Sequence, residues 1–417
     1  MTPHPMHGPN LFKLGVFATN VDGGLTVTKV PERWSAAWPE IVHAAQIADQ
    51  AGIDFFLPIA RWKGFEGETN ARQHSFETFT FAAALAGVTE RIGLFSTVHV
   101  PMIHPLYAAR AWATVDHASN GRAGLNIVAG WNPDEFGMFG LSKVDAPYDQ
   151  AGEWIEVISR LYTGSRPFDH NGKYYTLKAA ATLPKPIRGT RPPILNAAFS
   201  PPGRAFAAQH ADYLFTTFKS IEAGRDTIED VAKRSAETGR KVGVYTTTHV
   251  VCRPSRQEAE EYYEHYAVTM ADNAALDYMM GTQAANASNH DEETYRLRRK
   301  WFAGGAGTYP LIGTPGDIAE QMVEMSRAGF AGTTVSFVNF AAELPFFCQG
   351  VLPLLQQAGL RTGSPTVCWP NLAPTSSPPA RRSPTATGPT GPASPRCNRS
   401  RWRGRAPPLA RRWCRSR

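Results

Sequence analysis

Residues 91–131 read RIGLFSTVHVPMIHPLYAARAWATVDHASNGRAGLNIVAGW and contain the unit that decides the fold. Arg91–Val100 and Gly124–Ala129 are short apolar runs, and residues 106–119 between them place apolar side chains at helical spacing. Short apolar runs that alternate with amphipathic helices are typical of buried parallel strands joined by right-handed crossovers.

The same alternation extends in both directions along the chain. The strand-like runs are Phe12–Thr19, Ile53–Ala60, Arg91–Val100, Gly124–Ala129, Pro193–Ala198, Tyr213–Phe218, Val242–Cys252 and Thr333–Phe340. The helical patterns are Trp34–Ala51, Phe76–Val88, Leu106–Ser119, Asp149–Tyr162, Gly203–Ala211, Ile221–Thr238, the pair Arg256–Met280 and Pro315–Ala328, and finally Pro345–Ala358. Eight such units predict an α/β fold of the (β/α)8 TIM-barrel type. Residues 166–192 and 286–310 do not fit a minimal barrel, and we expect the first to form a small hairpin or lid and the second a long loop.

The C-terminal segment differs sharply from the rest of the 417-residue chain. Its last 57 residues, from Arg361, hold 12 Arg and no Lys, Asp or Glu, so this segment carries a formal charge of +12. Since the whole chain carries +7, residues 1–360 carry −5. The segment also has too few apolar residues to repay the entropy of chain ordering. We therefore predict a flexible N-terminus over residues 1–11, a barrel over 12–360 and a disordered Arg/Pro-rich tail over 361–417.

Two interpretations of the tail remain open. Its alphabet of Arg, Pro, Ala, Gly, Ser, Thr, Cys and Trp is what GC-rich DNA gives when it is read out of frame, which favours an altered reading frame near residue 361. The alternative is an Arg-rich arm that binds polyanions. For the acidic body we expect no nucleic-acid partner.

Cysteine content and hydropathy exclude several classes of protein. The body has only Cys252 and Cys348, which excludes a disulfide framework and suits the reducing cytoplasm. We expect neither a membrane span nor a signal peptide, because the sequence lacks the long apolar runs that they need. A Walker loop and the patterns GxGxxG, GxSxG and HExxH are absent, and the histidines share no metal-ligand spacing, so we expect no metal.

Barrel active sites form where strands end. Here the strand ends supply Leu57, Ala60 and Arg61, then Thr97, then Asn126, Trp131 and Glu135, and finally Ser200. Ser200 precedes a helix whose N-terminus suits a phosphate. Ser200 is equally suited to capping that helix, and Thr97 and Asn126 to satisfying neighbouring backbone groups.

At these positions the sequence resembles the bacterial luciferase-like flavin-dependent monooxygenases. The resemblance rests on the segments RWKGFEGET, TERIGLFSTVHVPMIHPLYAARAWATVDHASNGRAGLNIVAGWNPDEF, AFAAQHADYLF and LIGTPGDIAEQM. It covers residues 12–360 and is strongest to the pyrimidine oxygenase and dimethylsulfone monooxygenase subgroup.

This resemblance implies a two-component enzyme, in which a separate NAD(P)H:flavin reductase delivers reduced FMN (FMNH2). With O2 it would oxygenate or cleave a small sulfone, N-heterocycle or halogenated or nitro arene, through a flavin N5-peroxide and N5-oxide. The resemblance also favours a homodimer or homotetramer. The alternatives are a deazaflavin-dependent hydride-transfer enzyme on the same barrel and a non-catalytic flavin- or polyanion-binding protein.

The resemblance also assigns residues to roles. Motif by motif, it places FMN against Ala60, Arg61, Asn126, Glu135, Tyr148 and Ser200, and the oxygen pocket against Leu57, Thr97, Asn126, Trp131 and Phe215. The departures concern the phosphate: an Arg-Tyr pair of the relatives is Pro147-Tyr148 here, and their Gly-rich turn is Ala-Ala-Phe-Ser at residues 197–200. These departures predict phosphate binding that is weaker or differently arranged.

Overall fold

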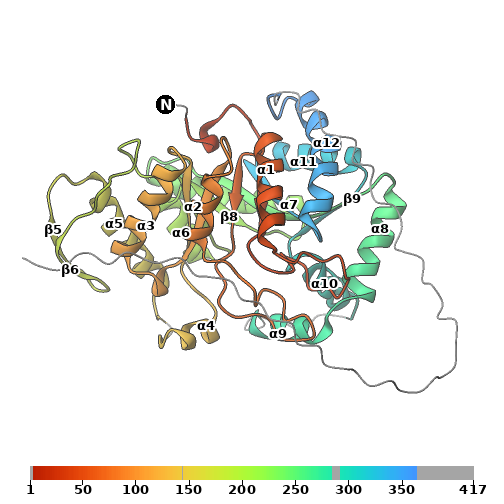
Figure 1. Ribbon diagram of the computed structural model, residues 1–417, viewed down its shortest axis with the longest axis horizontal. Helices are drawn as coiled ribbons and strands as arrows, with labels where there is room; N and C mark the ends of the chain where they lie inside the picture. The colour runs from red at the N-terminus through yellow and green to blue at the C-terminus, as the bar shows by residue number, and fades with distance from the viewer. Residues whose placement is uncertain (1–2, 143, 284–291, 364–417) are drawn as a thin grey trace, which may run out of the picture. The chain divides into compact units, whose positions relative to one another are not determined.

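The computed structural model describes residues 3–142, 144–283 and 292–363. The tail predictions for residues 364–417 therefore lie outside the described residues, as does the part of the 286–310 prediction before residue 292. Within the described part, parallel strands close into a barrel with helices around it (Figure 1). This confirms the predicted (β/α)8 fold.

Eight strands form the closed ring of the described chain, each hydrogen-bonded to two neighbours. In ring order they are β1 (Lys13–Phe17), β2 (Phe55–Leu57), β3 (Gly93–His99), β4 (Ala123–Val128), β7 (Ile194–Ala197), β8 (Tyr213–Thr216), β9 (Gly243–Cys252) and β11 (Gly332–Ser336). Each lies within one of the runs expected from the sequence or within one residue of it. A further strand, β10 (Tyr309–Gly313), pairs with the C-terminal half of the long β9.

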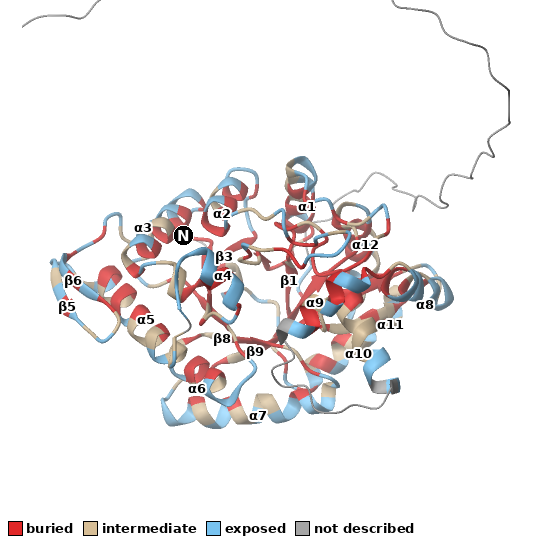
Figure 2. Cartoon of the chain, turned by 90° about the horizontal axis from the view of Figure 1, so that it is seen from below, coloured by how far each residue is buried: buried red, intermediate tan, exposed pale blue. Residues whose placement is uncertain are grey.

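The helices lie outside the ring and turn their buried sides toward the strands (Figure 2). They are α1 (Trp38–Gln50), α2 (Thr78–Ala86), α3 (Pro105–Ala118), α4 (Pro133–Met138), α5 (Pro147–Thr163), α6 (Pro201–His210), α7 (Ile221–Glu237), α8 (Arg256–Glu264), α9 (Asn273–Gln283), α10 (Glu292–Gly305), α11 (Pro315–Arg327) and α12 (Phe340–Gln357). Among the described residues, no helix is both long and apolar enough to cross a membrane.

Aromatic side chains fill the barrel interior because glycines on neighbouring strands make room for them. A Cβ at Gly15 would overlap the ring of Phe55, and a Cβ at Gly124 would overlap that of Phe95. The two rings meet edge to face, with centroids 5.5 Å apart. Met6 joins this cluster from the N-terminal end of the barrel, so the segment for which the sequence predicts flexibility is packed there.

The two insertions differ from each other. Residues 166–192 contain an antiparallel hairpin of β5 (Phe168–Asn171) and β6 (Thr176–Ala180). A small hairpin was one of the two predictions for this insertion. It lies at the periphery beyond α5 (Figure 1). The loop expected over 286–310 is wrong for residues 292–305, which form α10: Ala303 is buried, and its carbonyl accepts from Val27 N–H at 2.8 Å. Tertiary packing thus makes a helix of a polar segment that ends in glycines.

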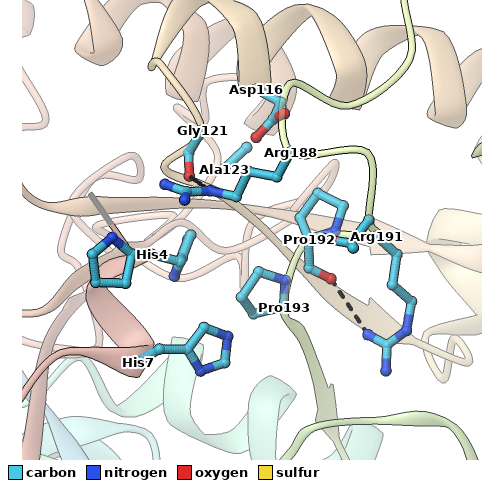
Figure 3. A pocket seen from close by; sticks show the side chains of 11 residues that line it. His4, His7, Asp116, Gly121, Ala123, Arg188, Arg191, Pro192 and Pro193 are labelled. Atoms are coloured by element: carbon cyan, nitrogen blue, oxygen red, sulfur yellow. Dashed lines mark hydrogen bonds between the residues drawn. The ribbon is translucent and has the colours of Figure 1, made fainter. Parts of the chain in front are cut away.

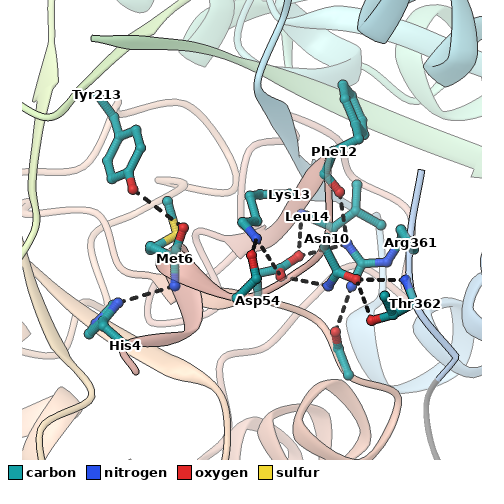
Figure 4. Close-up of polar contacts among 12 residues, drawn as sticks. His4, Met6, Asn10, Phe12, Lys13, Leu14, Asp54, Tyr213, Arg361 and Thr362 are labelled. Atoms are coloured by element: carbon teal, nitrogen blue, oxygen red, sulfur yellow. Dashed lines mark hydrogen bonds and ion pairs between the residues drawn. The ribbon is translucent and has the colours of Figure 1, made fainter. Parts of the chain in front are cut away.

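A buried polar network joins the two ends of the described chain (Figure 4). Arg361 Nη1 lies 2.6 Å from Asp54 Oδ2 and also donates to the carbonyl of Phe12 at 3.0 Å. Lys13 Nζ lies 3.9 Å from the same carboxylate, and all three charged side chains are less than 8% exposed. Composition assigns Arg361 to the tail, whereas the structure places it within the packed barrel.

Candidate active site

The predicted site residues converge on one end of the barrel because they follow the C-terminal ends of parallel strands. Leu57 ends β2, while Thr97, Asn126 and Phe215 lie near the ends of β3, β4 and β8. Helix α4, after β4, and helix α9 lie at the opposite end of the barrel from the N-terminus (Figure 1). The structure thus collects side chains that are far apart in the sequence.

The floor of this site is apolar. Leu57 is fully buried and Phe215 is 5% exposed, and both belong to the interior cluster with Phe95 and Leu195. The ring of Phe17 meets that of Phe215 edge to face at 5.3 Å. A group bound above these side chains is therefore shielded from water on this side.

A polar pair stands at the edge of the apolar floor. Asn126 Nδ2 donates to Thr97 Oγ1 at 3.2 Å, and Thr97 Oγ1 donates to the carbonyl of Pro58 at 2.5 Å. The buried Asn126 Oδ1 accepts no hydrogen bond from any residue that the structure describes. Because the Thr97 hydroxyl donates to the carbonyl of Pro58, the spare donor of this pair is the second N–H of Asn126.

A buried ion pair lies next to the polar pair. Arg61 Nη1 is 3.1 Å from Glu135 Oε1, and the same oxygen accepts the N–H of Trp62 at 2.9 Å. Burial lowers the pKa of Arg61, and the Glu135 carboxylate opposes that change. Glu135 is held there by α4, whose Asn132 side chain caps the helix by accepting from Asp134 N–H at 3.0 Å. Removing one member of a buried pair costs several kcal/mol, so this pair fixes the loop after β2 against α4.

Aromatic rings form the rim of the site. The Arg61 guanidinium lies 5.0 Å from the centroid of the Trp131 ring and 5.6 Å from that of Phe65. Trp131 is 40% exposed and Ala60 is half-buried. Trp62 packs edge to face on Phe139 at 4.9 Å. Sequence reasoning missed Phe65, Trp62 and Phe139, although Trp62 and Phe65 both lie within the quoted segment RWKGFEGET.

Tyr148 and Ser200 both lie beside Gly203 in the first turn of α6. The space beside Gly203 is taken by the Tyr148 hydroxyl, which a Cβ at residue 203 would overlap. Ser200 is the N-cap and accepts from Gly203 N–H at 3.3 Å, as the capping alternative predicts. Pro201 and Pro202 occupy the first helical turn and have no N–H, so this N-terminus offers an anion fewer donors than a helix normally does.

A cavity of about 220 Å³ lies at the other end of the barrel (Figure 3). Its walls include His4, His7, Asp116 and Arg188, together with residues that precede β4 and β7. None of the predicted site residues lines it. The candidate site is therefore the arrangement at the C-terminal ends of the strands.

Comparison with known proteins identifies the family of this chain. Residues 12–332 match the family described as luciferase-like monooxygenase. The pyrimidine monooxygenase RutA of Klebsiella pneumoniae (strain 342) is 28% identical over 353 residues, which are 82% of this chain and 96% of the relative. Among solved structures, the riboflavin lyase RcaE has a TM-score of 0.76 at 21% identity, covering 85% of this chain and 94% of its own. DmoA from Hyphomicrobium sulfonivorans has a TM-score of 0.73 at 19% identity, and the match covers 84% of this chain and 89% of DmoA. Because the family match spans most of the described barrel, the chain belongs to the luciferase-like monooxygenase family.

Proposed function

We propose that this protein is a two-component monooxygenase that takes reduced FMN from a separate NAD(P)H:flavin reductase and uses O2 to oxygenate a small organic substrate. The substrate class is a sulfone, an N-heterocycle or a halogenated or nitro arene. The name of the RutA relatives supports the N-heterocycle. The observation that carries the proposal is the buried Thr97–Asn126 pair above an apolar floor.

The residues present fit the ring system of a flavin. Its polar edge needs partners, and Asn126 Oδ1 and Glu135 Oε2 are buried acceptors that no described residue satisfies. Leu57 and Phe215 exclude water, which protects a reactive oxygen species from wasteful breakdown. The second N–H of Asn126 would stabilise negative charge that develops on oxygen during the reaction. Bound reduced flavin supplies the electrons that activate O2.

The phosphate end also fits, with fewer donors. The Ser200 and Tyr148 hydroxyls can each donate to a phosphate oxygen, and the N-terminus of α6 adds its dipole. Since Pro201 and Pro202 donate nothing, the two hydroxyls carry most of the recognition. We therefore propose that FMN is held chiefly through its ring.

The test is a reductase-coupled assay with NADH, FMN and O2. A sulfone, uracil, a nitroarene, a chloroarene and an alkanesulfonate are supplied in turn, and oxygenated product is measured by mass spectrometry. We expect product from one class, dependent on both FMN and O2. Anaerobic turnover with a reduced deazaflavin, and none with reduced FMN, would instead establish hydride transfer.

A further inference from the structure

His99 lies in the candidate site but has no role in the function proposed above. It is the last residue of β3, two residues after Thr97. Side chains two residues apart point to the same face of a strand, so His99 lies one step beyond Thr97 toward the mouth of the barrel. It is 4% exposed.

Three buried polar atoms around His99 have no hydrogen-bond partner among the described residues. They are His99 Nδ1, Glu135 Oε2 and Arg61 Nε. His99 Nδ1 is 3.7 Å from Glu135 Oε2, and a movement of about 0.7 Å would bring it into hydrogen-bond range. An unmet buried polar atom is costly, and three on neighbouring residues indicate an arrangement that closes when a ligand binds.

The charges around His99 decide which of its nitrogens carries the proton. Burial, followed by the nearby Arg61 guanidinium, lowers the pKa of His99 to about 3. A neutral imidazole has one N–H and one acceptor nitrogen. Glu135 Oε2 faces Nδ1, so the carboxylate favours the proton at Nδ1.

We propose that His99 is a positioning residue that donates from Nδ1 to Glu135 Oε2 and so holds the Glu135–Arg61 pair in the orientation that binds the ligand. The carboxylate of Glu135 then has Arg61 on one oxygen and His99 on the other. The proposed function enters only in naming that ligand as FMN.

The first experiment needs no ligand. The ¹⁵N NMR spectrum of histidine-labelled full-length protein, with His99 assigned by its loss in His99→Asn, should show the Nδ1–H tautomer between pH 6 and 8. The Nε2–H tautomer overturns the proposal.

The second experiment compares two replacements. His99→Asn retains an N–H close to the position of Nδ1, whereas His99→Leu removes it. Loss of a hydrogen bond to a charged group weakens binding by roughly 10- to 100-fold, so the affinity for FMN should fall by that factor in His99→Leu. In His99→Asn the affinity should return most of the way to that of the wild type. Equal affinity in the two variants overturns the proposal.

The control is His117→Asn, at an exposed position near the C-terminal end of α3, where the imidazole Nε2 lies 2.8 Å from the carbonyl oxygen of Lys185. It should bind FMN as the wild type does. If the wild type binds no FMN, the proposed function fails, and the tautomer still decides the role of His99.

Discussion

Asn126 and Thr97 face each other across β3 and β4, with Asn126 Nδ2 donating to Thr97 Oγ1 at 3.2 Å. The Thr97 hydroxyl in turn donates a hydrogen bond to the carbonyl of Pro58. The chain of bonds therefore runs in one direction, and it fixes the Asn126 amide by way of Thr97. Of the two side chains, Asn126 alone retains a donor that no described residue engages.

This relationship predicts unequal effects on the coupling of O2 use to product. In Asn126→Ala, FMN still binds, but the oxygenation rate falls by about 100-fold, as when one preorganised donor is removed from an oxyanion site. Thr97→Ala loosens the amide and should have a smaller effect, which Thr97→Ser should reverse. Product, NADH consumed and hydrogen peroxide are measured together. Unchanged coupling in both alanine variants would contradict the assignment of this pair.

The start of α6 predicts how the protein tells FMN from riboflavin. Ser200→Ala and Tyr148→Phe each remove one hydroxyl, so FMN affinity should fall by about 10-fold while riboflavin affinity stays constant. Flavin fluorescence titration gives both constants. Ser220→Ala is the matched control, because Ser220 caps α7 by accepting from Ala223 N–H in the same way. An equal loss of FMN and riboflavin affinity would mean that Ser200 acts on the fold and not on the phosphate.

The Asp54–Arg361 pair predicts different results for two truncations. Ending the chain after residue 363 should leave the free energy of unfolding unchanged, because the network of Figure 4 stays whole. Ending it after residue 360 removes Arg361 from a buried pair and should cost about 3 kcal/mol.

Urea unfolding measures both truncations, and Arg361→Ala in the longer form should reproduce the loss. The same longer form tests the polyanion alternative for the tail. Full enzymatic activity without heparin binding would place function in the barrel. Equal stability of the two truncated chains would show that Arg361 contributes little.

Three buried histidines predict acid sensitivity. Burial lowers the pKa of His4, His99 and His249 to about 3, well below the ordinary value of 6.5. The unfolded chain takes up protons below pH 6.5 while the folded chain does not. Their contribution to stability is therefore complete above pH 6.5 and is lost as the pH falls from 6.5 toward 3, by about 1.4 kcal/mol per pH unit for each histidine.

The measurement is the free energy of unfolding at several values of pH between 7.5 and 5. In His4→Leu, the slope of the free energy of unfolding against pH should be smaller by the contribution of one histidine, about 1.4 kcal/mol per pH unit. His117→Asn, at an exposed position, should leave it unchanged. A slope that is the same in wild type and His4→Leu would show that His4 takes up its proton in the folded protein too.

The fold could be predicted from the sequence because its signal is local. Each barrel strand is a short apolar run between helical patterns, and every run contributed one strand near the expected bounds. The prediction was wrong for residues 292–305, where Ala303 and its neighbours are helical through contacts with residues far away in sequence.

The site could be predicted only as a set of residues. Strand ends and motif resemblance brought together Leu57, Thr97, Asn126 and Phe215, and in the structure Leu57 and Phe215 share one apolar cluster while Asn126 donates to Thr97. The role of His99 depends on Glu135, which is 36 residues away and is brought to it by α4. The alternation of Thr97 and His99 on β3 was the one local signal that could have indicated it.

By itself the sequence determined the barrel, the end at which the predicted site residues lie and the sharp change in composition at residue 361, because periodicity, strand order and charge are properties of neighbouring residues. Tertiary structure alone decided that Arg361 belongs to the barrel, that two prolines reduce the donors at the start of α6 and that His99 faces Glu135. These are matters of distance and hydrogen-bond direction between segments, which are set only when the chain closes on itself.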